Sequence, residues 1–181
     1  MGCSETLILG IGNTLLTDEG AGIHALNLLE ASYPDIQNLT FIDGGTLSFT
    51  LAVWIEDCPN LIVFDATQLN RPPGTVKTFV GTEMDDFLGK SKRSAHEVGL
   101  LDLMDIARLT EKLPENRALI GIQPEIMDWG MEPTPAVQNA LDVAASEAVN
   151  LLKTWQKVNA GQGIFKPEDY LRGNSEALKL T

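Results

Sequence analysis

Short apolar runs alternate with longer amphipathic segments through most of this chain, a pattern typical of repeated strand–helix units. The runs at 6–11, 39–42 and 61–64 contain few polar residues and predict strands that are buried on both faces of a parallel sheet. Thr17-Asp18-Glu19 offers a side-chain N-cap for a helix after the first strand, and a second helix is expected over 46–55.

The second half of the chain continues the pattern with one interruption. Residues 75–80 alternate polar and apolar after a proline-rich turn, which predicts an edge strand that could run antiparallel to the strand at 61–64. The polar stretch 81–93 predicts a loop with at most one helical turn around 84–88. Further elements are expected as a helix around 98–107, a last buried strand at 118–122 and a long helix at 136–158.

Composition and charge narrow the possible classes of protein. With 181 residues, 44% of them hydrophobic, the chain fits one α/β domain over 1–160 followed by a polar tail at 161–181. Its 13 Lys and Arg against 25 Asp and Glu give a net charge of −12, which disfavours nucleic acid and anionic membranes as partners. There is no membrane-length apolar run and there are only two cysteines, so we expect a cytoplasmic protein.

Several acidic residues follow the predicted strands, where an open parallel sheet binds its ligands. Glu19 comes after the first strand, and Asp43 and Asp65 end the second and third. Two carboxylates, Glu19 and Asp65, together with one imidazole from His96 would form a metal-binding set with open positions for water or substrate. His24 is the less favoured histidine, because on a helix it would face away from Glu19.

Other chemistries find less support in the residues. Gly10-Ile11-Gly12 resembles the start of a dinucleotide fingerprint, but Leu15 replaces the third glycine, and Asp18 and Glu19 would repel a pyrophosphate. The chain has no G-x-S-x-G elbow, and the Asp43-Gly44-Gly45-Thr46 turn has no twin that could complete a pair of aspartic loops.

Taken together, the separated motifs resemble those of the hydrogenase maturation endopeptidases, the proteases that complete nickel–iron hydrogenase large subunits. The resemblance extends from Leu7 to the end of the long helix. The segments that carry it are Leu9-Gly10-Ile11-Gly12-Asn13-Thr14-Leu15-Leu16-Thr17-Asp18-Glu19-Gly20-Ala21-Gly22, Asp43-Gly44-Gly45-Thr46, Phe64-Asp65-Ala66, Ser94-Ala95-His96-Glu97-Val98-Gly99-Leu100 and Gly121-Ile122-Gln123-Pro124-Glu125.

This resemblance implies a three-layer α/β/α sandwich with a five-stranded sheet and a peptidase that removes a C-terminal extension from a nickel-loaded precursor of the hydrogenase large subunit. It assigns metal binding to Glu19, Asp65 and His96, with the nickel supplied by the precursor; zinc or cadmium could replace it in a crystal. Asp43 is assigned to substrate positioning. The residues leave open whether the metal activates water or a carboxylate such as Asp43 is the general base. A non-proteolytic nickel carrier and a metal-dependent hydrolase of another substrate are the alternatives.

Overall fold

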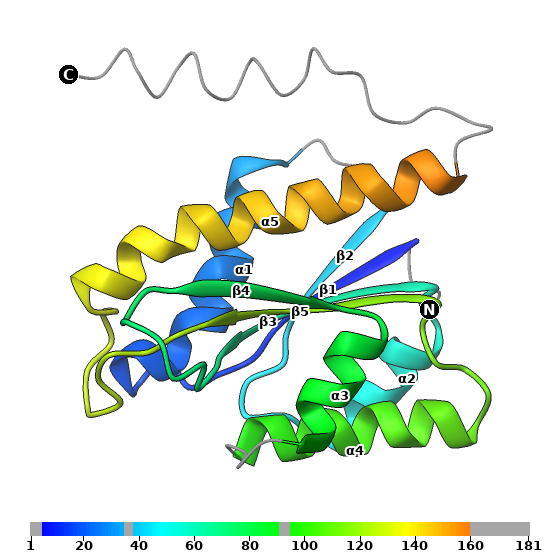
Figure 1. Cartoon of the computed structure of the whole chain (residues 1–181), viewed down its shortest axis with the longest axis horizontal. Coiled ribbons are helices and arrows are strands. Elements are labelled where there is room, and N and C mark those ends of the chain that lie inside the picture. Colours follow the sequence, from blue (N-terminus) through cyan, green and yellow to red (C-terminus); the bar gives the residue numbers. More distant parts are fainter. Residues whose placement is uncertain (1–4, 35–37, 91–94, 160–181) are drawn as a thin grey trace.

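A computed structural model describes residues 5–34, 38–90 and 95–159 (Figure 1). The predicted tail at 161–181 lies outside these residues. The strands are β1 (Thr6–Gly10), β2 (Leu39–Asp43), β3 (Asn60–Ala66), β4 (Val76–Val80) and β5 (Asn116–Ile122). The helices are η1 (Thr17–Gly20), α1 (Ala21–Ser32), η2 (Phe49–Leu51), α2 (Ala52–Glu56), α3 (Thr82–Lys90), α4 (Ala95–Leu109) and α5 (Pro135–Asn159), of which η1 and η2 are short 3₁₀ turns.

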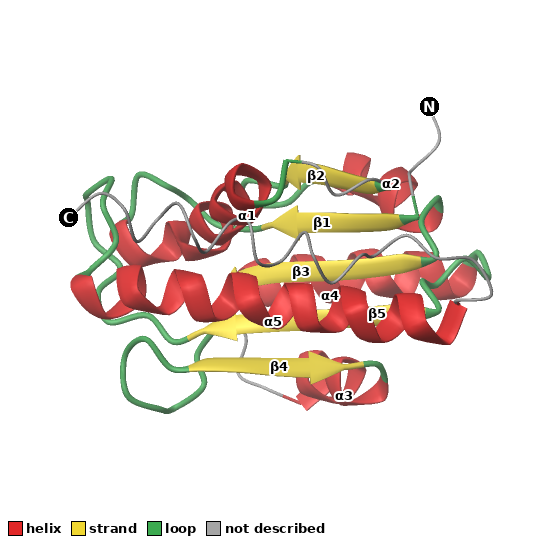
Figure 2. Ribbon diagram, turned by 90° about the horizontal axis from the view of Figure 1, so that it is seen from above, coloured by secondary structure: helices red, strands yellow, loops and turns green. Residues whose placement is uncertain are grey.

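The five strands form one sheet in the order β2-β1-β3-β5-β4. All neighbouring pairs are parallel except β4 with β5, as the arrow directions in Figure 2 show. The edge position and the antiparallel direction of β4 were both expected from its alternating sequence. The predicted partner strand was wrong. β4 pairs with β5 rather than with β3, from Val76 opposite Ile122 to Val80 opposite Ala118.

Helices cover both faces of the sheet, so the fold is the expected three-layer α/β/α sandwich (Figure 2). Alternate strand residues point to opposite layers because the side-chain period of a strand is two. Ile8, Ile62 and Phe64 pack against α1 and α5, whereas Leu9 and Val63 pack against the layer of α2, α3 and α4. The apolar character of both sets explains why the central strands appear as continuous apolar runs in the sequence.

Two local predictions were wrong. The stretch predicted as a loop at 81–93 contains the nine-residue helix α3. Met84 and Leu88, one helical turn apart, are both fully buried against the sheet, whereas its other positions are mostly polar. The second error concerns the start of α1, whose N-cap is Gly20 without a side-chain hydrogen bond, because Thr17, Asp18 and Glu19 lie in the preceding η1 turn.

The helix expected over 46–55 is shorter than predicted. It is divided into η2, capped by the Ser48 hydroxyl that accepts a hydrogen bond from the Thr50 amide, and the five-residue α2. None of the helices in the described part of the chain has the length and apolar character that crossing a bilayer requires.

Candidate active site at the carboxyl ends of the strands

The topological switch point of the sheet lies between β1 and β3. From β1 the chain passes through α1 to β2 on one side, whereas β3 lies on the other side of β1. Open α/β sheets bind ligands beyond the carboxyl ends of the strands at such a point. Glu19 in η1 follows β1, and Asp65 is the penultimate residue of β3, so the fold places both candidate ligands beside the switch point.

Close packing at two glycines holds the segment around Glu19 against the strand ends. Gly12 has φ +144°, and a Cβ there would lie 2.0 Å from the carbonyl oxygen of Glu19. A Cβ on Gly22 would lie 2.3 Å from the carbonyl oxygens of both Ile11 and Phe64. Only residues without a side chain permit these approaches. The start of α1 therefore lies directly on β3 at the residue that precedes Asp65.

Asp65 is fully buried and shares its sheet face with Val63, toward the layer of α2, α3 and α4. Thr67, also fully buried, lies on this face two residues later, and its hydroxyl donates to the backbone carbonyl of Asp65 at 3.4 Å. Gly121 on β5 makes room for Thr67, because a Cβ there would be 2.9 Å from the threonine Cβ. A carboxylate held at such depth in a sheet has the donor chemistry of a metal ligand.

Asp43 differs from Asp65 in both exposure and direction. It is exposed, and its Oδ1 accepts a hydrogen bond of 2.8 Å from the amide of Gly45, which closes the turn after β2. Because Asp43 is in register with Gly10, as is Phe64, strand alternation places it on the α1 and α5 face of the sheet. Asp43 and Asp65 therefore both lie at the carboxyl end of the sheet, but on opposite faces of it.

His96 lies in the first turn of α4, and its side chain is outside the described part of the structure. A Cβ on Gly99, three residues later, would lie 3.1 Å from Cδ1 of Leu47, in the loop that follows β2. The beginning of α4 is therefore at the carboxyl end of the sheet, near the turn that carries Asp43 (Figure 1). Within the described residues no group of three His, Cys, Asp or Glu is placed to hold a metal, so the set of Glu19, Asp65 and His96 stays a prediction.

His24, the histidine that the sequence disfavours as a ligand, is partly buried on α1. Its side chain is only partly exposed, and its Nε2 atom is buried with no hydrogen-bond partner in the described residues. The ring lies against Gly20, where an added Cβ would be 3.2 Å from Nε2.

Asp18, also at the carboxyl end of the sheet, has a structural role that the sequence did not reveal. Its fully buried carboxylate accepts hydrogen bonds from the amides of Glu125, Ile126 and Thr134, at 2.8, 3.0 and 2.7 Å, and from the Thr134 hydroxyl at 2.9 Å. The sequence predicts Asp18 as part of a helix N-cap whose charge would repel a pyrophosphate. It instead connects η1 to the loop between β5 and α5. No local pattern reveals this role, because its partners are more than 100 residues away.

Gln123 has a similar structural role on the other side of Asp65. Its buried side chain accepts hydrogen bonds from the amides of Leu69 at 2.8 Å and Arg71 at 3.4 Å, and donates to Gln68 at 3.1 Å. These bonds fasten the loop that follows β3 to the end of β5. The motif from Gly121 to Glu125 contains Gln123, but nothing in that motif predicts that the Gln123 side chain joins the two loops.

Comparison with known proteins shows the family to which this chain belongs. A family model described as hydrogenase maturation protease matches residues 23–151. The hydrogenase expression/formation protein HupD of Rhizobium leguminosarum is 37% identical over 150 residues, which cover 82% of this chain and 74% of that protein. The hydrogenase 2 maturation protease of Escherichia coli is 31% identical over 148 residues, covering 81% and 90% of the two chains.

Solved structures show the same similarity in three dimensions. The hydrogenase maturating endopeptidase HybD from Escherichia coli superimposes with a TM-score of 0.78 at 29% identity, over 83% of this chain and 93% of that chain. The [NiFe] hydrogenase maturation protease HybD from Thermococcus kodakarensis gives a TM-score of 0.69 at 30% identity, over 81% and 98%. Sequence motifs, fold and relatives agree, and this chain belongs to the hydrogenase maturation protease family, a family of peptidases.

Proposed function

We propose that this protein removes the C-terminal extension of a nickel-loaded [NiFe]-hydrogenase large-subunit precursor and that it recognises the nickel in that precursor. In this proposal Glu19, Asp65 and His96 contact the substrate's nickel, and Asp43 positions the peptide. The nickel is part of the substrate, so cleavage depends on prior metal insertion.

The observation that carries the proposal is the buried carboxylate of Asp65 at the switch point, with the segment that bears Glu19 packed on the adjacent strand ends. Oxygen ligands from two carboxylates and a nitrogen ligand from an imidazole suit a divalent first-row metal. The start of α4 at the same end of the sheet supports His96 as the third ligand. The same set would accept zinc or cadmium in vitro, because first-row and related ions compete largely by availability.

Peptide hydrolysis adds one water molecule across the scissile bond. The water oxygen forms a bond to the carbonyl carbon, the carbon–nitrogen bond breaks, and the leaving amine takes up a proton. Fixing the substrate through a bound metal would place the bond beside the carboxylates and would supply much of the rate enhancement by positioning. The hydrogen bond between Asp43 and Gly45 fixes the direction of the Asp43 carboxylate, as a positioning role requires.

The decisive experiment incubates the protein with nickel-loaded and nickel-free hydrogenase precursor and measures the intact mass of each product. We expect release of the C-terminal peptide only from the loaded form. Failure to cleave either form contradicts the protease proposal, and equal cleavage of both contradicts nickel recognition.

Variants of the proposed ligands test the assignment of residues. Glu19→Gln removes a negative charge from η1 with almost no change of volume, and His96→Ala removes the imidazole, so each should reduce processing by at least about a hundredfold. Glu115→Gln is the matched control, because Glu115 is an exposed acid at the amino end of β5 and its loss should leave processing unchanged. Normal turnover in Glu19→Gln or His96→Ala removes that residue from the site.

A further inference from the structure

Exposed apolar side chains gather next to the candidate site. We call this surface the apolar rim, and it consists of Leu15, Ile126, Met127, Trp129 and Met131. Trp129 is 80% exposed and Met131 is 65% exposed, with the other three near one half. These residues are five of the ten large exposed hydrophobic residues in the described part of the chain. Apolar side chains concentrated in this way on a protein surface mark interaction sites.

The loop between β5 and α5, which carries all residues of the apolar rim except Leu15, is held in place by a dense set of hydrogen bonds. The amide of Thr17 donates to the carbonyl of Gly130 at 2.6 Å, and its hydroxyl donates to the carbonyl of Ile126 at 2.6 Å. The Gly130 amide returns a bond of 3.0 Å to the Leu15 carbonyl. The four bonds to Asp18 described above complete the attachment. The apolar side chains therefore extend to solvent from an ordered backbone, which lowers the entropy lost when a partner binds them.

The same hydrogen bonds place the apolar rim beside the candidate site. Thr17 and Asp18, which bind the loop, directly precede Glu19 in η1. In Figure 1 the loop between β5 and α5 lies at the end of the sheet where η1 and the start of α4 are found. A protein chain cleaved next to Glu19 would therefore extend across or alongside the apolar rim.

Charge indicates the chemistry of the partner. No Lys or Arg occurs in the sequence from Ala118 to Leu152, whereas Glu125, Asp128 and Glu132 are interspersed among the apolar residues of the loop. A complementary surface has an apolar centre bordered by Lys or Arg. A second copy of this chain does not meet that requirement through the same surface, because it would oppose acids to acids.

We propose that the apolar rim is the docking surface for the hydrogenase precursor, which contributes an apolar patch with a basic border, and that Trp129 is its main anchor. This inference rests on the proposed function for the identity of the partner. Trp is the residue type most often found among interface hot spots, and its removal from such a position weakens binding roughly thirtyfold.

The test measures binding and processing of purified precursor by wild type, Trp129→Ser and Leu109→Ser. Leu109 is the matched control because it is 86% exposed and lies at the C-terminal end of α4, opposite the apolar rim. We expect Trp129→Ser to raise the Kd and the KM for the precursor at least about tenfold with little change in kcat, and Leu109→Ser to change neither. Both positions are exposed, so both variants should keep the wild-type Tm.

Two results overturn the inference: wild-type Kd and KM in Trp129→Ser, or an equal loss in Leu109→Ser. Binding measured by calorimetry in a Glu19→Gln background keeps this result separate from the proposed function. If wild type does not process the precursor but Trp129→Ser still loses binding, the docking surface stands and the protease proposal fails. If processing depends on Glu19 but binding does not change in Trp129→Ser, the protease proposal stands and the docking surface fails. Binding measured in about 0.5 M salt should be weaker, because salt screens the acids of the loop from the basic border of the precursor, and an unchanged Kd would contradict that border.

Discussion

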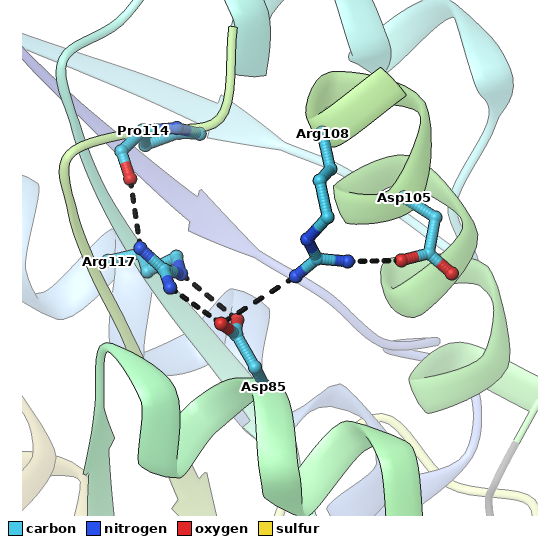
Figure 3. A network of polar contacts seen from close by, with 5 residues as sticks. All are labelled: Asp85, Asp105, Arg108, Pro114 and Arg117. Atoms are coloured by element: carbon cyan, nitrogen blue, oxygen red, sulfur yellow. Dashed lines mark hydrogen bonds and ion pairs between the residues drawn. The ribbon is translucent and has the colours of Figure 1, made fainter. Parts of the chain in front are cut away.

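The two ends of the sheet are stabilised by different kinds of polar contact. At the carboxyl end, Asp18 and Gln123 bind backbone amides of neighbouring loops, and glycines allow backbone segments to touch. At the amino end, side chains bind one another. Asp85 on α3 forms two hydrogen bonds with the guanidinium of Arg117, at 3.0 and 2.5 Å (Figure 3).

The amino end is closed by several such pairs. Arg108 on α4 also approaches Asp85, at 3.6 Å, and pairs with Asp105 in the preceding turn (Figure 3). The side-chain Nδ2 of Asn116 donates to the side-chain Oδ1 of Asn60 at 2.8 Å, so the first residues of β5 and β3 are joined through side chains.

The difference indicates how the fold separates stability from chemistry. Where side chains neutralise one another, as at the amino end, few remain to act on a ligand. At the carboxyl end the structural bonds are made mostly to backbone groups, so acidic and apolar side chains next to them can serve a substrate. Changes that remove one contact at each end test this distinction, because they should differ in their effect on processing more than in their effect on stability.

The largest effect is expected for Asp18→Asn. In the wild type two backbone amides and a hydroxyl donate to Oδ2 of Asp18, and the Thr134 amide donates to Oδ1. An Asn whose NH₂ group takes the Oδ1 position loses the bond from the Thr134 amide and places two donors opposite each other in a buried site, and the three remaining bonds lose their charged acceptor. We expect a loss of about 3 kcal/mol in the free energy of unfolding, measured in urea, together with impaired processing. Asp128→Asn, an exposed acid in the same loop, is the control and should change stability by less than about 0.5 kcal/mol. A variant as stable as wild type would show that the bonds to Asp18 do not hold the loop.

A smaller loss of stability, without loss of processing, is expected for Asp85→Asn. The change removes the charge opposite Arg117, whose side chain is only 13% exposed. The free energy of unfolding should fall by about 2 kcal/mol, because a mostly buried guanidinium loses its main partner. Processing of the precursor, measured at a temperature where both proteins are folded, should stay at the wild-type rate. A defect in kcat would contradict the separation of the two ends.

The Asp85–Arg117 pair should also be insensitive to pH in the neutral and mildly alkaline range. The hydrogen bonds that Arg117 donates to the Asp85 carboxylate raise the pKa of Arg117 above its ordinary value. A raised pKa stabilises the fold below the unfolded-state pKa, and the contribution is lost only as the pH passes the folded-state value. Both values for Arg117 lie above the usable range, so the difference in unfolding free energy between wild type and Asp85→Asn should be constant from about pH 7 to pH 10. A decline over that interval would contradict the assigned cause.

The smallest effect is expected for Glu83→Gln. Glu83 pairs with Lys77 at 3.4 Å, and both side chains are more than half exposed. Solvent and salt screen such a pair, so the unfolding free energy should change by no more than about 0.5 kcal/mol, and processing should not change. Chemical denaturation at low and high salt measures this. A loss comparable with that of Asp85→Asn would mean that exposure is a poor guide to the strength of ion pairs at this end.

Much of the fold could be predicted from the sequence because its signals are local. Apolar runs such as 61–64 and the helical spacing over 136–158 report burial directly, and the expected strands and long helices are present. The helix α3 was missed because its apolar face consists of only Met84, Phe87 and Leu88, and the polar residues around them resemble a loop. The pairing of β4 was missed because nothing within residues 75–80 distinguishes β5 from β3 as a partner.

The sequence by itself determined that strands and helices alternate, that Glu19 follows the first strand, that Asp43 and Asp65 lie at the ends of the next two, and that the motifs are those of hydrogenase maturation proteases. Only the tertiary structure decided that Asp43 and Asp65 lie on opposite faces of the sheet and that Asp18 binds a loop rather than caps a helix. The physical reason is the sequence separation over which the interactions act. Periodicity and turn preferences act over a few residues, whereas the bonds of Asp18 join positions 107 to 116 residues apart and exist only once the sheet has assembled.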